Sequence, residues 1–407
     1  MEAEVNHAAP PDSPLAAAAA TEPRQVTAVG HQWTIYVESA PLIEAMIEDI
    51  RAARQRVWVE SYIFLDDALG RRVGEALMER ARAGLDVRVL YDAIGSQGTS
   101  GRFWQQLAAA GVQLHAFHTV WEALARMRVF QILNRRNHRK LLVIDEQIAF
   151  FGGMNLLDQA HAGDNPQVGS VAGSLGWRDV HVRLVGPRQA DVAESFERSW
   201  KRAHRQRVKR RPLAYRQAKL AVDQGPESLQ FFDSGPGLTH TRASRVFRQL
   251  FGLARRSLLM SMAYFLPVGL VLRDLLRAHR RGVHVRVVVP GASDVPLVQC
   301  ATRHLYAQLL RRRFHIYERQ RNMLHSKVLV VDGEWTVLGS SNLDPRSLWI
   351  NLEFLAVVRS RTLAQAIEEI ILHELQHSRR IRLTEAVCRP WWRRTIDRLA
   401  WSFRWWL

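Results

Sequence analysis

The sequence predicts an α/β fold made of two similar halves, each a mixed β-sheet flanked by helices, related by a pseudo-twofold axis and sharing one active site. One motif occurs twice, as "NHRKLLVIDEQIAFFGGMN" at 137–155 and as "LHSKVLVVDGEWTVLGSSN" at 324–342. A second repeat, "RQRVWVESYIF" at 54–64 and "RSLLMSMAYFL" at 256–266, opens each half with the apolar pattern of a buried strand. Because both repeats occur in the same order, the chain contains one structural unit twice.

Further strands and helices alternate between these repeats. A strand introduced by glycine follows an amphipathic segment in each half, "RAGLDVRVLYD" at 82–92 and "RRGVHVRVVVP" at 280–290. A third strand, "VQLHAF" at 112–117 and "FHIYER" at 314–319, precedes each motif. The predicted order in each half is strand, helix, strand, helix, strand and motif hairpin, which is the alternation of an α/β sheet.

Composition divides the chain into five segments. Residues 1–28 begin with an acidic stretch and an alanine run, which predict a disordered tail, and the first half covers 29–205. A basic stretch that contains a proline predicts a linker at 206–225. The second half covers 226–385, and an amphipathic Trp/Arg-rich helix covers 386–407.

Charge and cysteine content narrow the function. The 407 residues include 57 Lys+Arg and 39 Asp+Glu, a formal net charge of +18 that favours nucleic acid, an anionic membrane or a phosphate-bearing substrate as the partner. Cys300 and Cys388 are too few for a disulfide framework and lack the spacing of a metal site, so we expect a reducing compartment. No basic region precedes the N-terminal alanine run, and no uncharged apolar run approaches the roughly 18 residues that span a bilayer. Any membrane contact is therefore predicted to be peripheral.

Each motif has the pattern of a β-hairpin with its reactive groups at one end. Residues two apart on a strand share a face, so His138 lies beside Lys140, and His325 lies beside Lys327. Each pair can line one pocket. Histidine can act as a nucleophile or an acid near neutral pH, and lysine offers positive charge to phosphate oxygens.

The expected turns bring an asparagine to the same end of each hairpin. Two-residue turns at 146–147 and 333–334, the second a type II′ turn with glycine first, set Asn155 and Asn342 opposite the motif histidines. The asparagine amides then add hydrogen bonds to a phosphate group bound by the lysines.

The remaining motif residues have supporting roles in this register. Asp145 and Asp332 lie beside the turns, too far from the imidazoles to touch them, so we expect a structural role for both. Gly152, Gly153 and Gly339 leave room for a close approach by substrate or backbone.

Displacement at phosphorus through a covalent intermediate explains why the motif occurs twice. One group attacks, while another protonates the departing alcohol and later deprotonates the incoming one. A single hairpin supplies half of this machinery. Two hairpins that face each other supply the nucleophile, the acid, two lysines and two asparagines without a metal.

Both hairpins closely resemble the signature of the phospholipase D superfamily, which is His-x-Lys, four residues, Asp, six residues, Gly-Gly/Ser, one residue, Asn. The matching residues are His138, Lys140, Asp145, Gly152, Gly153, Asn155, His325, Lys327, Asp332, Gly339, Ser340 and Asn342. The resemblance implies two phospholipase D-like halves, catalysis by the His, Lys and Asp residues, and no metal or other cofactor. It implies substrate binding by Asn155, Asn342, Gly153 and Ser340.

The superfamily also places a carboxylate against the unreactive side of each histidine. In the second half Glu353 occupies that place. The first half departs from the pattern, because a Gly- and Ala-rich insertion at 160–176 follows its motif. Asp179 is the candidate there, and a surface carboxylate on a strand is its alternative interpretation.

The resemblance narrows further to bacterial cardiolipin synthases, particularly the B type without N-terminal transmembrane helices. It covers about residues 30–385 and includes "ESYIFLDD" at 60–67, "WRDVHVRLVGP" at 177–187 and "GSSNLDPRS" at 339–347. It implies transfer of a phosphatidyl group from one phosphatidylglycerol to another, which gives cardiolipin and glycerol through a phosphohistidine. By analogy with relatives, His138 is the expected nucleophile and His325 the acid/base. Phosphatidylethanolamine or another alcohol stays open as a replacement for one phosphatidylglycerol.

The C-terminal helix gives independent evidence of a membrane partner. In "PWWRRTIDRLAWSFRWWL", apolar side chains recur at helical spacing: Trp392, Ile396, Leu399, Phe403 and Trp406. Arginines occupy other positions. A Trp-rich, basic amphipathic helix suits the surface of an anionic membrane, and the alternative is a terminal helix packed on the body. We therefore expect peripheral binding to the cytoplasmic face of the bacterial cytoplasmic membrane, with phosphatidylglycerol as partner and no nucleic acid.

Other functions explain fewer of these features. "HELQH" at 373–377 matches a zinc-protease motif, but a metzincin continuation is absent, and we expect an exposed helix face there. A phospholipase D-type phosphodiesterase or nuclease shares the hairpins but leaves the tryptophan-rich tail unexplained. A non-catalytic lipid-binding protein has no need of both complete motifs.

Overall fold

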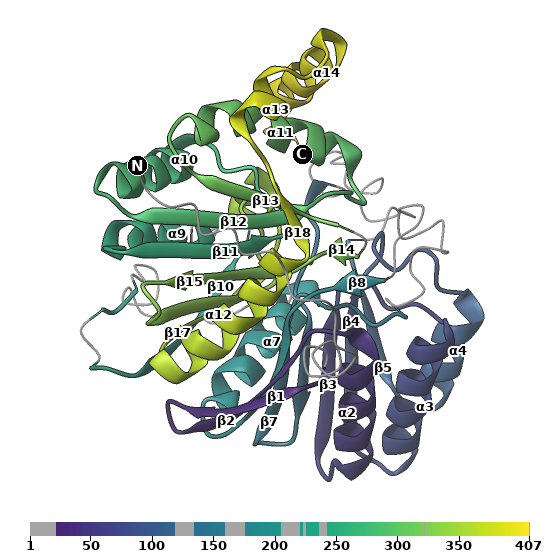
Figure 1. Cartoon of the computed structure of the whole chain (residues 1–407). Helices are drawn as coiled ribbons and strands as arrows, with labels where there is room; N and C mark the ends of the chain where they lie inside the picture. Colours follow the sequence, from purple (N-terminus) through teal and green to yellow (C-terminus); the bar gives the residue numbers. More distant parts are fainter. Residues whose placement is uncertain are drawn as a thin grey trace.

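The computed structural model describes residues 22–118, 134–158, 176–204, 220–222, 225–235, 242–320 and 322–406. In these residues the strands form two eight-stranded sheets, one in each half, and a separate two-stranded sheet, and helices cover the faces of the large sheets (Figure 1). The prediction of two similar α/β halves with mixed sheets is confirmed.

The first sheet has the strand order β1-β2-β9-β7-β6-β3-β4-β5. Strands β3, β4 and β5 are parallel, while β6, β7 and β9 pair antiparallel, so the sheet is mixed. The strands are β1 (Arg24–Ala28), β2 (His31–Tyr36), β3 (Arg56–Ser61), β4 (Asp86–Asp92), β5 (Gln113–Phe117), β6 (Leu141–Ile144), β7 (Ile148–Gly152) and β9 (His181–Val185). The helices are α2 (Ser39–Ala52), α3 (Ala68–Arg82), α4 (Gly101–Ala109) and α7 (Gln189–Ala203).

The second sheet has the order β10-β17-β16-β15-β11-β12-β13-β18. Its strands are β10 (Ser228–Ser234), β11 (Ser257–Met262), β12 (His284–Pro290), β13 (His315–Arg319), β15 (Lys327–Val331), β16 (Trp335–Gly339), β17 (Glu353–Arg359) and β18 (Ser378–Arg380). Its helices are α9 (Arg242–Leu253), α10 (Gly269–Arg280), α11 (Pro296–Leu310), the π-helical turn η2 (Arg346–Ile350), α12 (Arg361–Gln376), α13 (Leu383–Val387) and α14 (Trp391–Ser402). Without the edge strands β1 and β18, both sheets have the same order, β2-β9-β7-β6-β3-β4-β5 matching β10-β17-β16-β15-β11-β12-β13.

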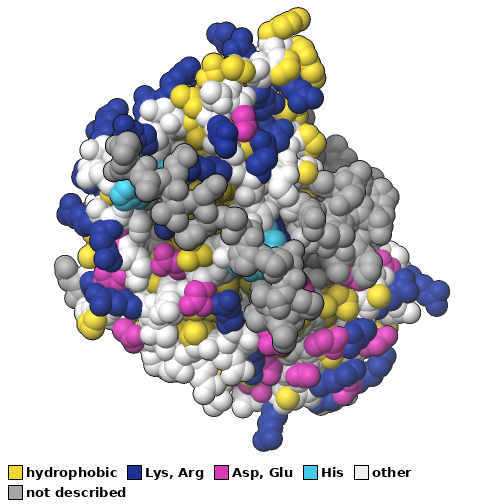
Figure 2. Space-filling model, in the orientation of Figure 1, with side chains coloured by type: hydrophobic (Ala, Val, Ile, Leu, Met, Phe, Trp, Pro, Cys, Tyr) yellow, Lys and Arg dark blue, Asp and Glu magenta, His cyan; other side chains and the backbone are white. Residues whose placement is uncertain are grey.

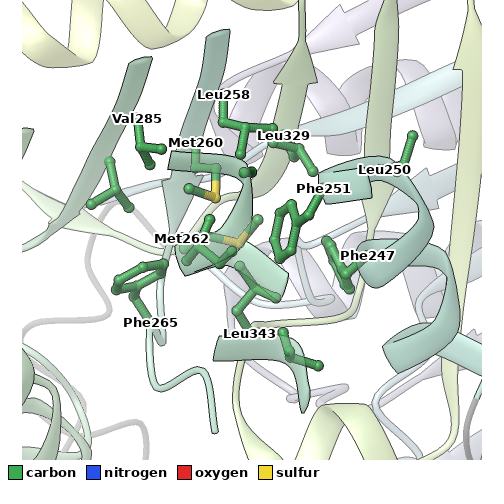
Figure 3. Close-up of a cluster of buried hydrophobic side chains, with 14 of the residues drawn as sticks. Phe247, Leu250, Phe251, Leu258, Met260, Met262, Phe265, Val285, Leu329 and Leu343 are labelled. Atoms are coloured by element: carbon green, nitrogen blue, oxygen red, sulfur yellow. The ribbon is translucent and has the colours of Figure 1, made fainter. Parts of the chain in front are cut away.

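Apolar residues of the repeated strands form the core because helices cover them. On one face of the second sheet, Phe247 and Phe251 of α9 point toward Met260 and Met262 of β11, and all four side chains are fully buried (Figure 3). Burial on this scale is the main stabilising contribution to the fold.

The two halves share a buried layer. Phe196 of α7 and Ile367 of α12 belong to one apolar cluster with Val182 of the first sheet and Leu259 of the second. Helices α7 and α12 therefore lie between the sheets (Figure 1). This layer fixes the two motif hairpins relative to each other.

The hairpin turns differ from the prediction by one residue. Ile144 pairs with Ile148 and Val331 pairs with Trp335, so each loop has three residues rather than two. The predicted two-residue turns, including the type II′ turn, are wrong. The first loop residue, Asp145 or Asp332, has a positive φ of 48° or 56°, because its carboxylate is held by a neighbouring segment.

The predicted segment boundaries can be compared with the structure only where the structure describes the residues. Residues Arg24–Ala28 form strand β1, so the prediction of a disordered tail is wrong for them, since they pair with β2. Residues 1–21, most of the predicted linker at 206–225 and nearly all of the insertion at 160–176 lie outside the described residues. Among the helices that the structure describes, none has the length and apolar character to cross a membrane.

Candidate active site

The two motif hairpins meet at one cavity of about 450 Å³. His138, Lys140 and Asn155 line it from the first half, and His325, Lys327 and Asn342 line it from the second. The expectation of a single site shared by both halves is therefore met by the geometry. Most of these side chains are nearly inaccessible to solvent.

Main-chain hydrogen bonds cross between the halves directly beside each histidine. The amide of His138 donates to the carbonyl oxygen of Leu352 (3.0 Å), and the amide of His325 donates to that of Arg178 (2.7 Å). Strands β8 (Trp177–Arg178) and β14 (Met323–Leu324) pair in parallel at the second crossing. The main chain of each histidine is thus hydrogen-bonded to the other half. The bonding partner there, Leu352 or Arg178, directly precedes a carboxylate residue, Glu353 or Asp179.

Because of these crossings, the carboxylate of each half lies against the motif histidine of the other half. Asp179 lies against His325, with 2.7 Å between Oδ2 and Nδ1, and Glu353 lies against His138, with 3.7 Å between Oε1 and Nδ1. We expected each carboxylate to serve the histidine of its own half. That pairing is wrong, because the twofold arrangement brings the start of β17 and the segment before β9 to the opposite motif.

The pair His325–Asp179 is tight and charged. The Nδ1–H of His325 donates to Asp179, and Nζ of Lys327 lies 3.3 Å from the same oxygen. Burial raises the pKa of Asp179, but Lys327 and His325 outweigh it and hold this pKa below the usual range of an aspartate. Asp179 is therefore ionised and fixes the ring so that Nε2 is free to react.

The pair His138–Glu353 is looser. Burial raises the pKa of Glu353 to about 8, against the opposing effects of the Ser340 hydroxyl, which donates to Oε2 at 2.5 Å, and of Lys140. Among the described residues, the buried Oε1 of Glu353 has no hydrogen-bond partner. Near neutral pH Glu353 therefore carries a proton, and the two halves of the site are electrostatically unequal.

The basic groups of the site are shifted toward their neutral forms. Burial, followed by Lys140, places the pKa of His138 well below its usual value, and burial also lowers the pKa of His325, although Asp179 opposes this shift. Burial lowers the pKa of Lys140 to about 7 and lowers that of Lys327, which Asp179 opposes. An anionic ligand between the hairpins would favour the charged lysines.

The asparagines are held in one orientation. Oδ1 of Asn155 accepts from the amide of Ile63 (3.3 Å), and Oδ1 of Asn342 accepts from the amide of Tyr264 (3.2 Å). Both asparagines also line the cavity. With each side-chain carbonyl occupied, the amide NH₂ group is the part available to a ligand oxygen.

Gly153 and Ser340 serve the carboxylates rather than the cavity. A Cβ atom at Gly153 would lie 2.1 Å from Oδ1 of Asp179, and Ser340 is fully buried against Glu353. Neither residue is among those that line the cavity, and the expectation that they bind substrate stays a prediction. The close approach expected at Gly339 is by backbone, because a Cβ there would lie 2.1 Å from the carbonyl oxygen of Phe354.

Asp145 and Asp332 lie at the far ends of the hairpins. The Asp145 carboxylate accepts from the amides of Arg54, Gln55 and Arg56 at 2.8–3.0 Å. Asp332 accepts in the same way from the amides at 255–257. Both aspartates therefore hold the start of a central strand, as expected from the register. Neither lines the cavity, which is contrary to the catalytic role that the resemblance implies for them.

The cavity contains residues that the sequence did not identify. Tyr62 lies against the His138 ring, with 4.3 Å between centroids, and Trp177 lies 4.9 Å from the His325 ring. Arg136, Arg346 and the C-terminal Trp406 also line the cavity. The repeat could have pointed to Tyr62, which directly follows a repeated strand, but no motif spacing predicts the others.

The HELQH segment is not a metal site in the described residues. Among them no group of histidine, cysteine and carboxylate side chains could hold a metal ion. Glu374 is buried and forms ion pairs with Arg178 (3.1 Å) and Arg319 (3.0 Å). The expectation that this segment is wholly exposed is therefore wrong for Glu374, which links β8, β13 and α12.

Comparison with known proteins agrees with this geometry. The family model described as "Cardiolipin synthase, PLD-like domain" matches residues 46–168 and 247–375, one match in each half. Cardiolipin synthase A of Pseudomonas putida is 33% identical over 354 residues, covering 86% of this chain and 69% of that protein. Cardiolipin synthase of Halalkalibacterium halodurans is 31% identical over 349 residues, covering 86% and 67%. The Pseudomonas relative is named cardiolipin synthase A. The expectation that this chain resembles the B type in particular therefore stays a prediction.

Solved structures share the fold at lower identity. The phosphatidylserine synthase of Haemophilus influenzae Rd KW20 has a TM-score of 0.69 at 17% identity and covers 94% of both chains. The polyphosphate kinase of Porphyromonas gingivalis has a TM-score of 0.54 at 14% identity, covering 84% of this chain and 50% of that one. These likenesses concern the arrangement of the two halves. The duplicated family match and the relatives above 30% identity show that the chain belongs to the cardiolipin synthase family of phospholipase D-like phosphatidyltransferases.

Proposed function

We propose that this protein transfers a phosphatidyl group from one phosphatidylglycerol to another and releases glycerol, through a phosphohistidine. The observation that carries the proposal is the single cavity into which both His-Lys-Asn sets project. The names of the relatives support cardiolipin as the product.

In the first step His138 attacks the donor phosphorus. Its Nε2 forms the P–N bond while the P–O bond to glycerol breaks, and His325 gives its Nε2 proton to the departing glycerol oxygen. Lys140, Lys327 and the two asparagine amides hold the non-bridging oxygens as charge develops on them.

In the second step the acceptor hydroxyl replaces glycerol. His325, now neutral, takes the proton of the hydroxyl, the oxygen attacks phosphorus, and the P–N bond to His138 breaks. His325 ends the cycle protonated, and His138 ends it neutral. With water as the acceptor, the same steps give phosphatidic acid.

The unequal carboxylates support this assignment of the histidines. His138 faces a protonated Glu353 and has a pKa well below its usual value, so its imidazole is neutral and nucleophilic. His325 faces the ionised Asp179 at 2.7 Å, which opposes the lowering of the His325 pKa by burial and so favours the imidazolium that an acid catalyst requires.

Peripheral binding to an anionic membrane surface, at its cytoplasmic face, completes the proposal. Of the ten exposed large hydrophobic side chains among the described residues, seven lie in the C-terminal segment 391–406, with Trp391 74% exposed. Figure 2 shows hydrophobic side chains beside Lys and Arg at the end of the molecule that carries α14. The helix packs on α11 by its other side, where Ala400 is buried and Trp401 stacks on His304. Aromatic and basic residues together suit the lipid headgroup region.

The test uses the purified full chain with labelled phosphatidylglycerol in mixed micelles that contain a chelator. Wild type is expected to form cardiolipin and glycerol in equal amounts. His138→Ala and His325→Ala are each expected to lose about 10³-fold or more of this rate, since both groups act on the reacting atoms.

Trapping separates the two histidines. Rapid quenching at alkaline pH followed by peptide mapping should find the phosphatidyl group on His138. Its recovery on His325 alone would reverse the assignment, and cleavage of DNA without any cardiolipin formation would favour the nuclease alternative.

A further inference from the structure

The cavity contains a cation beyond those needed to bind one phosphodiester. A phosphodiester has two non-bridging oxygens and one negative charge. Lys140, Lys327, Asn155 and Asn342 already offer two positive charges and two amides to these oxygens. Arg346, which is half-buried, lines the same cavity from the start of η2.

The contacts of Arg346 leave one edge of its guanidinium available. Nη1 donates to Oδ1 of Asn134 (2.8 Å) and to the carbonyl oxygen of Trp406 (3.4 Å), and Nη2 donates to the carbonyl oxygen of Asn134 (2.8 Å). These contacts use three of the five N–H donors. Within the described residues, the N–H of Nε and one N–H of Nη2 have no acceptor, and these two nitrogen atoms are neighbours on the planar guanidinium. This is the geometry in which arginine binds two oxygens of a phosphate.

Arg346 also forms no ion pair with a described residue. No described carboxylate lies within 4.0 Å of its guanidinium, whereas Arg136, the other arginine of the cavity, pairs with Asp92 at 3.2 Å. Asp344 shares the loop of Arg346 and lines the same cavity, and Arg346 is among the groups that oppose the raising of its pKa by burial to about 6. Its carboxylate accepts from the amide and hydroxyl of Ser347 and forms no ion pair with the Arg346 guanidinium. Arg346 therefore presents a positive charge to the cavity.

The charges are placed unevenly across the cavity. Arg346 is one of the cations that lower the pKa of His138, so it acts on the side of the proposed nucleophile. Asp294, whose Oδ2 accepts from the Tyr264 hydroxyl at 2.7 Å, acts on the side of His325. A ligand with an anionic group and a hydroxyl group fits this polarity, with the anion near Arg346 and the hydroxyl near His325.

We infer that Arg346 binds the phosphodiester of the acceptor lipid, a second phosphate subsite beside the one at which transfer occurs. The inference rests on the proposed function, because the acceptor phosphatidylglycerol brings its own phosphodiester into the cavity, three carbons from the attacking hydroxyl. Neither lysine is available for this group while both hold the transferred phosphorus. Arg346 thereby selects an acceptor that is itself a phospholipid over water or a small neutral alcohol.

A partition experiment isolates the acceptor step. The full chain is given labelled phosphatidylglycerol micelles with a fixed concentration of ethanol, so the same phosphohistidine is shared between two acceptors. The measured quantity is the ratio of cardiolipin to phosphatidylethanol. Arg346→Gln is expected to lower this ratio roughly tenfold, the order expected for loss of a charge-assisted pair of hydrogen bonds, while Arg346→Lys is expected to lose less.

The matched control is Arg361→Gln, which removes one charge from an exposed position at the start of α12. Its ratio should equal that of wild type, because general attraction to anionic micelles does not depend on the cavity. Phosphatidylethanol formed by Arg346→Gln also shows that this variant is folded and takes up the donor.

Three results would overturn the inference. An unchanged ratio in Arg346→Gln would show that Arg346 does not recognise the acceptor. Loss of both products together would show that it serves the donor or the fold. Wild type that forms phosphatidylethanol or phosphatidic acid but no cardiolipin would instead remove the proposed function, and the acceptor subsite with it.

Discussion

Asp179 and Glu353 hold the two histidines of the cavity in different charge states. Asp179 is ionised and hydrogen-bonded to His325, whereas Glu353 is protonated near neutral pH and lies 3.7 Å from His138. Replacing each carboxyl by an amide therefore has a different effect on the charge beside each histidine. An amide at 179 removes a charge from the proposed acid, while an amide at 353 keeps the neutral state that is already present.

The expected outcome is an unequal pair of variants at pH 7. Asp179→Asn should lower kcat by about 100-fold or more, because His325 loses the group that stabilises its imidazolium. Glu353→Gln should lower kcat less than about tenfold, because the carboxyl has a pKa of about 8 in the folded protein. Both values come from the initial rate of glycerol release in phosphatidylglycerol micelles.

The pH–rate profile distinguishes this positioning role from a loss of structure. Asp179 raises the pKa of His325, so its removal lowers that pKa, and the acid form of His325 is lost at a lower pH. The alkaline limb of the Asp179→Asn profile should therefore move to lower pH. Equal rate losses in both variants, with unmoved limbs, would contradict the assignment of acid and nucleophile.

At the level of elements, each motif aspartate fastens its hairpin to the neighbouring central strand. Asp145 accepts from three main-chain amides at 54–56, where β3 begins, and Asp332 accepts in the same way from the amides at 255–257, where β11 begins. Asp145→Ala leaves these amides without a partner and should lower the free energy of unfolding by about 1–3 kcal/mol. Urea denaturation measures the loss.

The neighbouring carboxylate supplies the control for this prediction. Glu146→Ala removes an exposed charge from the same loop and should leave stability within about 0.5 kcal/mol of wild type. The kcat of folded Asp145→Ala is expected to stay within a few-fold of wild type. A large loss of kcat at unchanged stability would instead place Asp145 among the reacting groups.

The positions of the hairpin strands could be predicted from the sequence, but the length of the hairpin turns could not. Short apolar runs were enough to place β6, β7, β15 and β16, and the two-residue period of a strand put His and Lys on one face. The turn length was wrong by one residue. It depends on the positive φ of Asp145 and Asp332, which is stabilised by contacts with a segment about 90 or 76 residues earlier in the chain. Local turn preferences carry no information about such contacts.

At the level of the whole molecule, the duplicated motif predicted one shared site. It did not predict that each histidine would meet the carboxylate of the other half. Two copies of one motif imply a twofold arrangement, and the two sheets have it. Which carboxylate meets which histidine depends on the crossing of His138 with Leu352 and of His325 with Arg178. Arg346 and Trp406 enter the cavity through the same packing of distant segments, so no spacing in the sequence points to them.

The C-terminal helix α14 has an exposed aromatic face, and we expect this face to bind an anionic membrane. Deletion of 390–407 should weaken sedimentation with phosphatidylglycerol vesicles, since it removes most of the exposed large hydrophobic side chains of the described residues. The deletion also removes the Trp406 carbonyl that contacts Arg346, so it changes the cavity as well. A sharper variant is the triple change Trp392→Ser, Leu399→Ser and Phe403→Ser, which keeps Ala400 and Trp401 on α11. It should bind these vesicles at least about tenfold more weakly and still form cardiolipin in detergent micelles, whereas unchanged sedimentation would show that α14 is not the membrane-binding surface.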